Sequence, residues 1–281
     1  MNNFESKGDS LKTMIKVTYH VIHNNLRGWS TFFGTLIISL VNVGLRFIVL
    51  LLVAEMVSEP KISELYIDFV RYISAGFILN TLIVIAVESF YDIFRSNYWN
   101  GGFDLFASSP LGLKPLIIGG LISRYIIASI YIIALTIIAL IMGVNFTISN
   151  IISLLCLTLV SLLIAHGIGM IATIEFTYLD QKGGSILVWI FTWLDTLLSG
   201  VIIPINMLPP QLAFISNLMP FKYYYTIARN LLFNVEMPYH IIVTNILILS
   251  VFATIIFPIG LILLKKGIEY AEEKGTIYIW S

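Results

Sequence analysis

The stretch from Ser199 to Phe233 decides the fold, and it reads SGVIIPINMLPPQLAFISNLMPFKYYYTIARNLLF. It contains four of the chain's nine prolines: Pro204, Pro209, Pro210 and Pro220. No residue between Thr196 and Phe221 is charged, and apolar runs lie on both sides. Non-helical backbone at membrane depth is tolerated only where protein or a water-filled cavity covers it. The stretch therefore predicts a helix that enters a bilayer, breaks near Pro204 and returns as short pieces. A hydrophobic loop that packs on its neighbours is the alternative.

The composition indicates an integral membrane protein. Of the 281 residues, 58% are hydrophobic and 11% are charged, whereas soluble domains carry about 25% charged residues. The formal net charge is zero, which gives no reason to expect a nucleic-acid partner. The single cysteine, Cys156, has no cysteine partner for a disulfide or a metal cluster. We therefore expect a chain embedded in a lipid bilayer, with no metal or cofactor of its own.

Six apolar runs approach the roughly 20 residues that a helix needs to span a bilayer. They lie near residues 31–54, 73–90, 117–142, 148–174, 186–204 and 240–264. In residues 11–28, a basic face recurs every three or four positions at Lys12, Lys16, His20, His23 and Arg27. Such a helix suits the membrane interface. The sequence thus predicts an all-α polytopic protein, with one transmembrane domain over residues 1–281 and an interfacial N-terminal helix.

Six spans put both termini on one side of the membrane, and the basic residues indicate which side. Segments 1–30, 91–124, 175–185 and 265–281 hold eleven lysines and arginines, while segments 55–72, 143–147 and 205–239 hold four. The sixteenth basic residue, Arg46, lies inside a span. We therefore expect both termini in the cytoplasm, in a multi-pass protein of the cell membrane. Segment 205–235 then re-enters from the outer side, and segment 91–115 is cytoplasmic.

Among the ionisable residues inside the predicted spans, three stand out: Arg46, His166 and Asp195. Such groups are energetically expensive and commonly face a partner or a cavity. At 1.5 Å per residue, Asp195 and His166 each lie about 14 Å from the cytoplasmic end of their spans, and Arg46 lies about 22 Å from its own. We expect Asp195 to pair with Arg46 or His166, within one protomer or across a dimer. Such a pair could line a pathway or be structural. Glu88 and Glu175 lie at cytoplasmic span ends, where we expect water to reach them.

The cytoplasmic segment contains a short apolar element. Asn100, Gly101 and Gly102 predict a turn, and Pro110 ends the element that contains Phe103, Leu105 and Phe106. These apolar side chains need a surface on which to be buried. That surface is either the underside of the spans or a cytoplasmic partner.

No catalytic motif accompanies these segments. The sequence has no Gly-Lys dipeptide and so no Walker phosphate loop, and it has no HExxH, GxSxG or GxGxxG motif. Work driven by ATP would therefore require another polypeptide. An ion-gradient transporter is the alternative, with Asp195 and His166 as a relay, but it would need broken spans in both halves. A membrane-embedded enzyme or assembly factor would need more polar groups at one depth.

Two motifs resemble those of the membrane subunit of type-2 exporter ABC transporters. The outer motif consists of Ser199-Gly200, Pro204, Leu208-Pro209-Pro210, Pro220-Phe221 and Arg229, with Met219 where the family often has Asn. The inner motif consists of Gly101-Gly102-Phe103-Asp104-Leu105 followed by Ser108-Ser109-Pro110-Leu111. Gly102 and Phe103 depart from the threonine and aliphatic residue usual in the family.

The resemblance implies a mechanism. Two permease subunits, commonly identical, would form a dimer above two separate ATP-binding subunits, which would bind the ATP. The segment from Gly101 to Pro110 would be the coupling helix that contacts the ATPase. The first, second and fifth spans would border the pathway. The outer motif, with Gly200, Pro204, Pro209, Pro220 and Arg229, would form a lid over it.

Overall fold

The computed structural model describes residues 2–31, 33–57, 63–107 and 109–275, and this part of the chain is helical without a strand. The helices are α1 (Asn2–Thr31), α2 (Phe33–Val57), α3 (Ser63–Trp99), α4 (Gly102–Ala107), α5 (Lys114–Ile141), α6 (Ile151–Thr177), α7 (Ile186–Leu198), the 3-10 helix η1 (Ile205–Met207), α8 (Pro210–Ser216), α9 (Pro220–Phe233) and α10 (Tyr239–Lys274).

Four of these helices are long and apolar enough to cross a membrane, namely α3 from Phe69 onward, α5, α6 and α10. The protein is therefore a multi-pass membrane protein. The other two predicted spans correspond to shorter apolar helices, Ile37–Leu50 within α2 and Ile186–Leu198. The sequence predicted a fifth span that extends to Pro204, but α7 ends at Leu198 because Gly200 takes a left-handed φ of +80°. Its 13 residues are about 20 Å long, less than the roughly 30 Å of a bilayer core.

Helices α3 and α6 form the centre of the bundle, with α5 packed on α3 and α10 packed on α6. Glycines allow the backbones of α6 to approach both neighbours. A methyl group added at Gly169 would lie 2.5 Å from the Val87 carbonyl oxygen of α3. One added at Gly260 of α10 would lie 2.5 Å from the Gly167 carbonyl oxygen. Small residues at such crossings allow the close backbone packing that associates helices in membranes.

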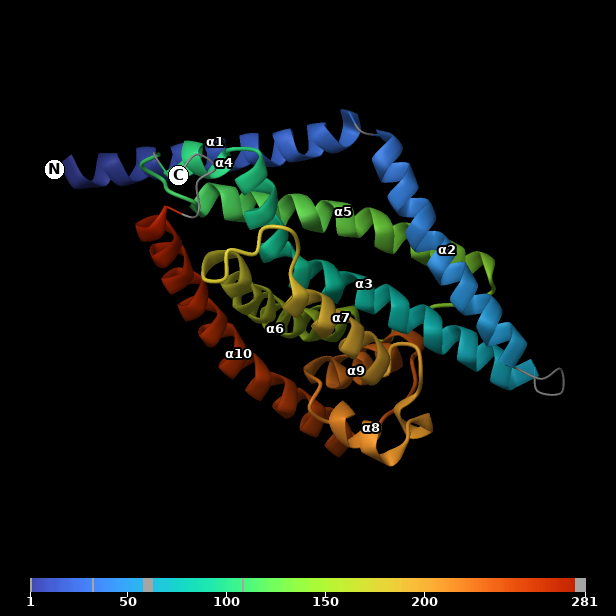
Figure 1. The fold of residues 1–281 in the computed structure, drawn as a ribbon. Helices are drawn as coiled ribbons and strands as arrows, with labels where there is room; N and C mark the ends of the chain where they lie inside the picture. The colour runs from blue at the N-terminus through green and yellow to red at the C-terminus, as the bar shows by residue number, and fades with distance from the viewer. Residues whose placement is uncertain (1, 32, 58–62, 108, 276–281) are drawn as a thin grey trace.

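Helix α1 includes the predicted amphipathic segment and packs along α5 (Figure 1). Val21 and Thr18 are buried on its inner face, and a methyl group added at Gly119 of α5 would lie 2.7 Å from Val21 Cγ1. Asn25 Nδ2 donates to Ser123 Oγ at 3.3 Å. The helix is thus fixed to the bundle as well as being suited to an interface.

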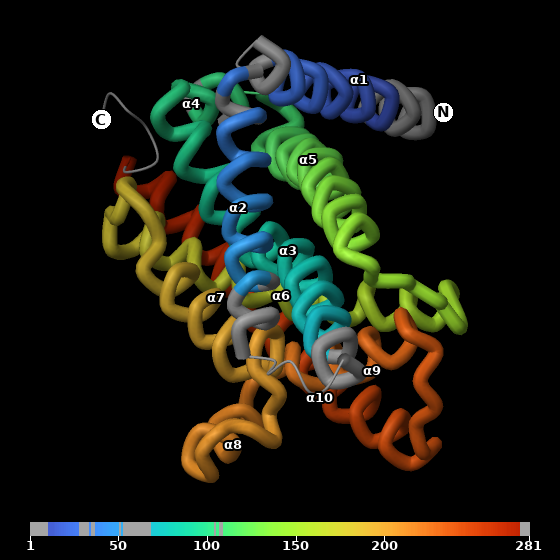
Figure 2. Tube along the Cα trace, turned by 90° about the vertical axis from the view of Figure 1, so that its right-hand side faces the viewer, coloured from blue at the N-terminus to red at the C-terminus, as the bar shows by residue number. Residues whose placement is uncertain are grey.

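The short helices α4 and α8 lie at opposite ends of the bundle, as Figures 1 and 2 both show. Helix α1 and the end of α10 lie at the α4 end. We call the α4 end the inner end and the α8 end the outer end. The breaks in the helices at the two ends contain the two motifs singled out in the sequence.

Candidate functional site

The inner motif begins with a tight reversal after α3. Gly101 has a φ of +67°, a left-handed conformation that glycine adopts at little cost at the end of a helix. A side chain at Gly102 would overlap Asn97 Oδ1, and Asn97 Nδ2 in turn donates to the Ile93 carbonyl at 2.7 Å. The two glycines therefore let α4 fold back against the last turns of α3.

Phe103 fixes α4 to the bundle. Its side chain is 1% exposed, and its ring packs edge-on against Phe94 at 5.3 Å and at a tilt against Phe176 at 6.1 Å, measured between ring centroids. For Phe103, the structure thus shows the self-packing alternative. Phe106 is half-buried, and Leu105 is 70% exposed. Pro110 is exposed beyond the end of α4, and the side chain of Asp104 lies outside the described residues.

The connector between α6 and α7 is tied to the same aromatic cluster through Lys182. Its ammonium lies 3.7 Å from the Phe176 ring centroid and 5.0 Å from that of Tyr98, and it donates to the Phe176 carbonyl at 2.9 Å. Asp180 pairs with it at 2.9 Å. We call Phe94, Tyr98, Phe103, Phe176 and Lys182 the inner connector cluster.

Glu175 then links this connector to α7. Its carboxylate accepts hydrogen bonds from Ser185 Oγ and from the Leu187 N–H, the latter at 3.0 Å. Only 6% of Glu175 is exposed, so the expectation that water reaches it was wrong. The reason is local, because the unpaired N–H groups at the start of α7 attract a carboxylate. The signal in the sequence was Ser185, which caps α7 through the Val188 N–H.

At the outer end, Gly200 and Arg229 of the outer motif meet. Arg229 Nη2 and the Tyr72 hydroxyl both donate to the Gly200 carbonyl, at 3.0 and 2.7 Å. The guanidinium lies 3.5 Å from the Tyr72 ring centroid. Gly76 leaves room for this arrangement, because a methyl group there would overlap the Val201 carbonyl oxygen and lie 2.6 Å from Arg229 Nη2. We call these residues the outer clamp.

The prolines of the outer motif lie at or just before the start of each helical piece. Pro204 immediately precedes η1, and Pro209 precedes α8, whose first residue is Pro210. Pro220 is the first residue of α9. Proline suits a first helical position, because its φ is already helical and the N–H it lacks would be unpaired there. The short pieces expected after α7 are therefore present.

A buried polar cluster lies beside the outer clamp. Asp195 is 1% exposed and accepts hydrogen bonds from Ser199 Oγ, from the Tyr225 hydroxyl at 2.9 Å and from Asn80 Nδ2 at 3.3 Å. Asn80 Nδ2 also lies 3.0 Å from the Tyr225 hydroxyl oxygen. The cluster joins α3, α7 and α9. Sequence reasoning missed Asn80 and Tyr225, although an asparagine inside an apolar span is itself a signal of helix association.

The pairing expected within one protomer was wrong. Neither Arg46 nor His166 is among the bonded partners of Asp195; instead His166 Nε2 lies 2.7 Å from the Tyr125 hydroxyl. Arg46 is exposed on α2, and no hydrogen bond or ion pair joins it to a described residue. Comparable depth in the bilayer does not fix which helix faces meet, and neutral donors lay closer to the carboxylate. Pairing across a dimer stays a prediction.

These features define an all-helical, multi-pass membrane protein in which no group of histidines, cysteines or carboxylates among the described residues could hold a metal ion. Residues 19–233 match the model of the family described as ABC-2 type transporter. That match covers more than half of the sequence, so the chain belongs to the ABC-2 type transporter membrane family, as the resemblance predicted. A search of curated proteins gave no match.

Proposed function

We propose that the chain is the permease subunit of an ATP-driven exporter of the cell membrane. Two copies form the pathway, and two separate ATP-binding subunits dock at the inner end, which is cytoplasmic together with both termini. Membership of the ABC-2 family supports a transport role and an ATP-binding partner in general. The observation that carries the proposal further is the form of α4.

Helix α4 is suited to transmit force from a partner. It is rigidly fixed on one side, where Phe103 is packed among aromatic rings, and it presents Leu105 on the other. A six-residue helix has little stability of its own in water. Its attachment to α3 and α6 therefore supports a role in which displacement of α4 moves the bundle. In this role Phe103 supports the coupling helix, and Leu105 contacts the ATPase.

The inner connector cluster also offers a route from α4 toward the outer end. Phe176 contacts Phe103, and Glu175 beside it holds the first turn of α7. Helix α7 then ends at the buried polar cluster and the outer clamp. We propose that movement of α4 is passed along α7 to the segment 199–233, which covers the pathway as a lid that re-enters the membrane from outside.

Arg46 supports a pathway formed by two copies. It is exposed on α2 on a face that also carries the exposed Ile38, Asn42 and Val49. A charged side chain facing lipid near the membrane interior is unfavourable, whereas one facing a water-filled cavity or a partner is tolerated. The α2 face therefore suits the border of a central pathway, and the same face of two copies can supply both sides of it.

The test is copurification of the full chain with its cognate ATP-binding subunit, measured together with ATP hydrolysis by the complex. Leu105→Asp is expected to reduce the recovered ATPase at least tenfold, because it places a charge in an apolar contact. Leu218→Asp is the matched control, since Leu218 is 60% exposed and lies at the outer end, beyond the reach of a cytoplasmic subunit. Equal ATPase recovery with Leu105→Asp and the unaltered chain would disprove docking at α4.

A further inference from the structure

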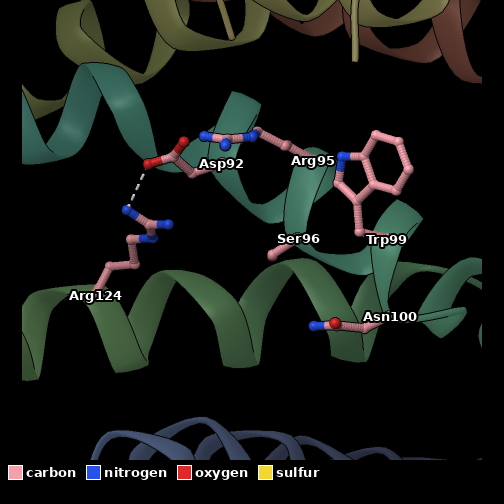
Figure 3. Close-up of a pocket in the computed structure, with 6 residues that line it drawn as sticks. All are labelled: Asp92, Arg95, Ser96, Trp99, Asn100 and Arg124. Atoms are coloured by element: carbon pink, nitrogen blue, oxygen red, sulfur yellow. Dashed lines mark hydrogen bonds and ion pairs between the residues drawn. The ribbon is translucent and has the colours of Figure 1, made fainter. Parts of the chain in front are cut away.

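A pocket between the end of α3 and the middle of α5 has no role in the proposed transport cycle. It encloses about 370 Å³ and opens to the surface. Figure 3 shows its walls, which consist of Asp92, Arg95, Ser96, Trp99, Asn100 and Arg124. The volume lies within the roughly 300–1,000 Å³ of sites for small molecules, so the pocket can hold more than a bare ion.

The pocket presents two guanidinium groups and one carboxylate. Arg124 Nη1 pairs with Asp92 Oδ2 at 2.7 Å, and both side chains are about one-third exposed (Figure 3). No hydrogen bond or ion pair joins Arg95, which is exposed, to a described residue. Glu88, one turn deeper on α3, is half-buried and interacts electrostatically with Asp92 and Arg124. The carboxylates thus engage Arg124 more closely than they engage Arg95.

The place of the pocket near the inner end of α3 favours a position at the membrane interface. The predicted second span, residues 73–90, ends just before Asp92. On the α5 side, Ser123 next to Arg124 bonds to Asn25 of the amphipathic helix α1. Trp99 at the pocket rim is 61% exposed, and tryptophan is enriched at the depth of lipid headgroups. Its indole N–H already donates to the Lys182 carbonyl at 3.4 Å, so Trp99 offers its ring rather than a donor.

We propose that this pocket binds the phosphate group of an anionic lipid headgroup. Arg95 and Arg124 hold the phosphate oxygens, because the planar guanidinium fork matches phosphate geometry. Ser96 and Asn100 face the hydroxyl groups of the headgroup. Basic pockets between transmembrane helices on the cytoplasmic side suit such ligands. The proposal rests on the inner end being cytoplasmic and not on ATP-driven export.

The ion pair between Asp92 and Arg124 makes the proposal sharply testable. A bound phosphate must compete with Asp92 for Arg124, so Asp92→Asn should strengthen binding even though it removes a native contact. A partly exposed ion pair contributes up to about 1 kcal/mol, which corresponds to a gain in affinity of up to about fivefold. A purely structural role for the ion pair predicts no such gain.

The experiment uses the full chain in bilayer nanodiscs of phosphatidylcholine with a minor fraction of phosphatidylglycerol, and native mass spectrometry counts the lipids retained. Arg95→Gln is expected to lower phosphatidylglycerol retention about tenfold, the factor for about 1.4 kcal/mol. Lys265→Gln is the matched control, because Lys265 is an exposed cation near the inner end of α10, away from the pocket. It is expected to retain phosphatidylglycerol as the unaltered chain does.

Three outcomes would overturn the proposal. They are equal losses for Arg95→Gln and Lys265→Gln, equal retention of phosphatidylglycerol and phosphatidylcholine, and weaker binding after Asp92→Asn.

Inorganic phosphate distinguishes the source of the anion. Release of phosphatidylglycerol only at a large excess of phosphate supports the lipid headgroup. Binding of inorganic phosphate that depends on Arg95, without selective retention of phosphatidylglycerol, assigns the pocket to a free phosphate instead.

Discussion

The inner connector cluster and the outer clamp both hold a glycine-containing break between helices, but different contacts hold them. At the inner end, the rings of Phe94, Phe103 and Phe176 pack together, and the Lys182 ammonium lies above the Phe176 ring. At the outer end, the guanidinium of Arg229 and a tyrosine hydroxyl bind backbone carbonyls. The first is mainly apolar packing, and the second is mainly hydrogen bonding.

The difference follows from the surroundings of the backbone carbonyls at the end of each helix. The last carbonyls of a helix have no partner within it, and water can pair with them only where it is present. At the end of α7 the surroundings are apolar helices, and side chains supply the donors. Ser216 Oγ donates to the Leu198 carbonyl at 2.6 Å, and Arg229 reaches both the Gly200 and the Val201 carbonyls. At the inner end, Lys182 donates to the Phe176 carbonyl at 2.9 Å, but the contacts that fix α4 are mainly between aromatic rings.

The largest expected effect tests the aromatic packing at the inner end. Phe103→Ala removes a ring that is 1% exposed, and truncation of a buried phenylalanine costs about 3–5 kcal/mol. Thermal unfolding in detergent micelles should show this loss. Leu105→Ala, on the exposed side of the same helix, is the control and should change stability by less than about 0.5 kcal/mol. Equal effects of the two substitutions would show that Phe103 is not a packing residue.

The next effect tests the close approach at the outer clamp. Gly76→Ala places a methyl group against the Val201 carbonyl and Arg229, and overpacking of this kind costs about 1–3 kcal/mol. We expect a lower melting temperature in detergent. Gly34→Ala is the matched control, since nothing lies within 4 Å of an added methyl group at that helical glycine. A Gly76→Ala variant as stable as the control would mean that the clamp can shift to make room.

The sequence predicted the elements at both ends better than their contacts. Glycine and proline act on the local backbone, so the turn at Gly101 and the short pieces that follow Pro204 could be predicted without knowing the fold. The family motif contained both Gly200 and Arg229, but it did not predict the contact between them. In contrast, the end of α7 at Leu198 could not be placed from hydropathy, because the residues after the break are just as apolar.

The partners of the ionisable residues were harder to predict for a physical reason. Depth along a span is set by counting residues, but the direction of a side chain depends on how the helix is rotated against its neighbours. Asp195 and His166 have similar depths and yet bind Tyr225 and Tyr125 instead of each other. Neutral donors in apolar spans, such as Asn80, give a weak signal in sequence and a decisive one in the structure.

A smaller effect tests the hydrogen bonds of the buried polar cluster near the outer end. Asp195→Asn keeps the side-chain shape but replaces one acceptor oxygen by a donor, so Ser199 or Tyr225 loses its partner. Interhelical hydrogen bonds in membranes are worth about 0.6–2 kcal/mol each, and we expect a loss of stability of about 1–2 kcal/mol. Glu236→Gln, at an exposed outer carboxylate, is the control and should unfold like the unaltered chain. Normal stability and normal ATP hydrolysis of the Asp195→Asn complex would remove Asp195 from both structural and pathway roles.

The smallest effect concerns Lys182, whose charge adds to the aromatic packing of the inner connector cluster. Lys182→Met keeps the length of the side chain and should cost about 0.5–1 kcal/mol at neutral pH, the range for an ammonium over aromatic rings.

Burial lowers the pKa of Lys182 below its ordinary value of 10.5. The unfolded chain then binds more protons in the interval just below that value, so the stability of the unaltered protein rises with pH there. Lys182→Met lacks this rise, whereas the exposed-site control Lys266→Met keeps it. Parallel stability curves for the unaltered chain and Lys182→Met across that interval would show that burial does not disfavour the Lys182 charge.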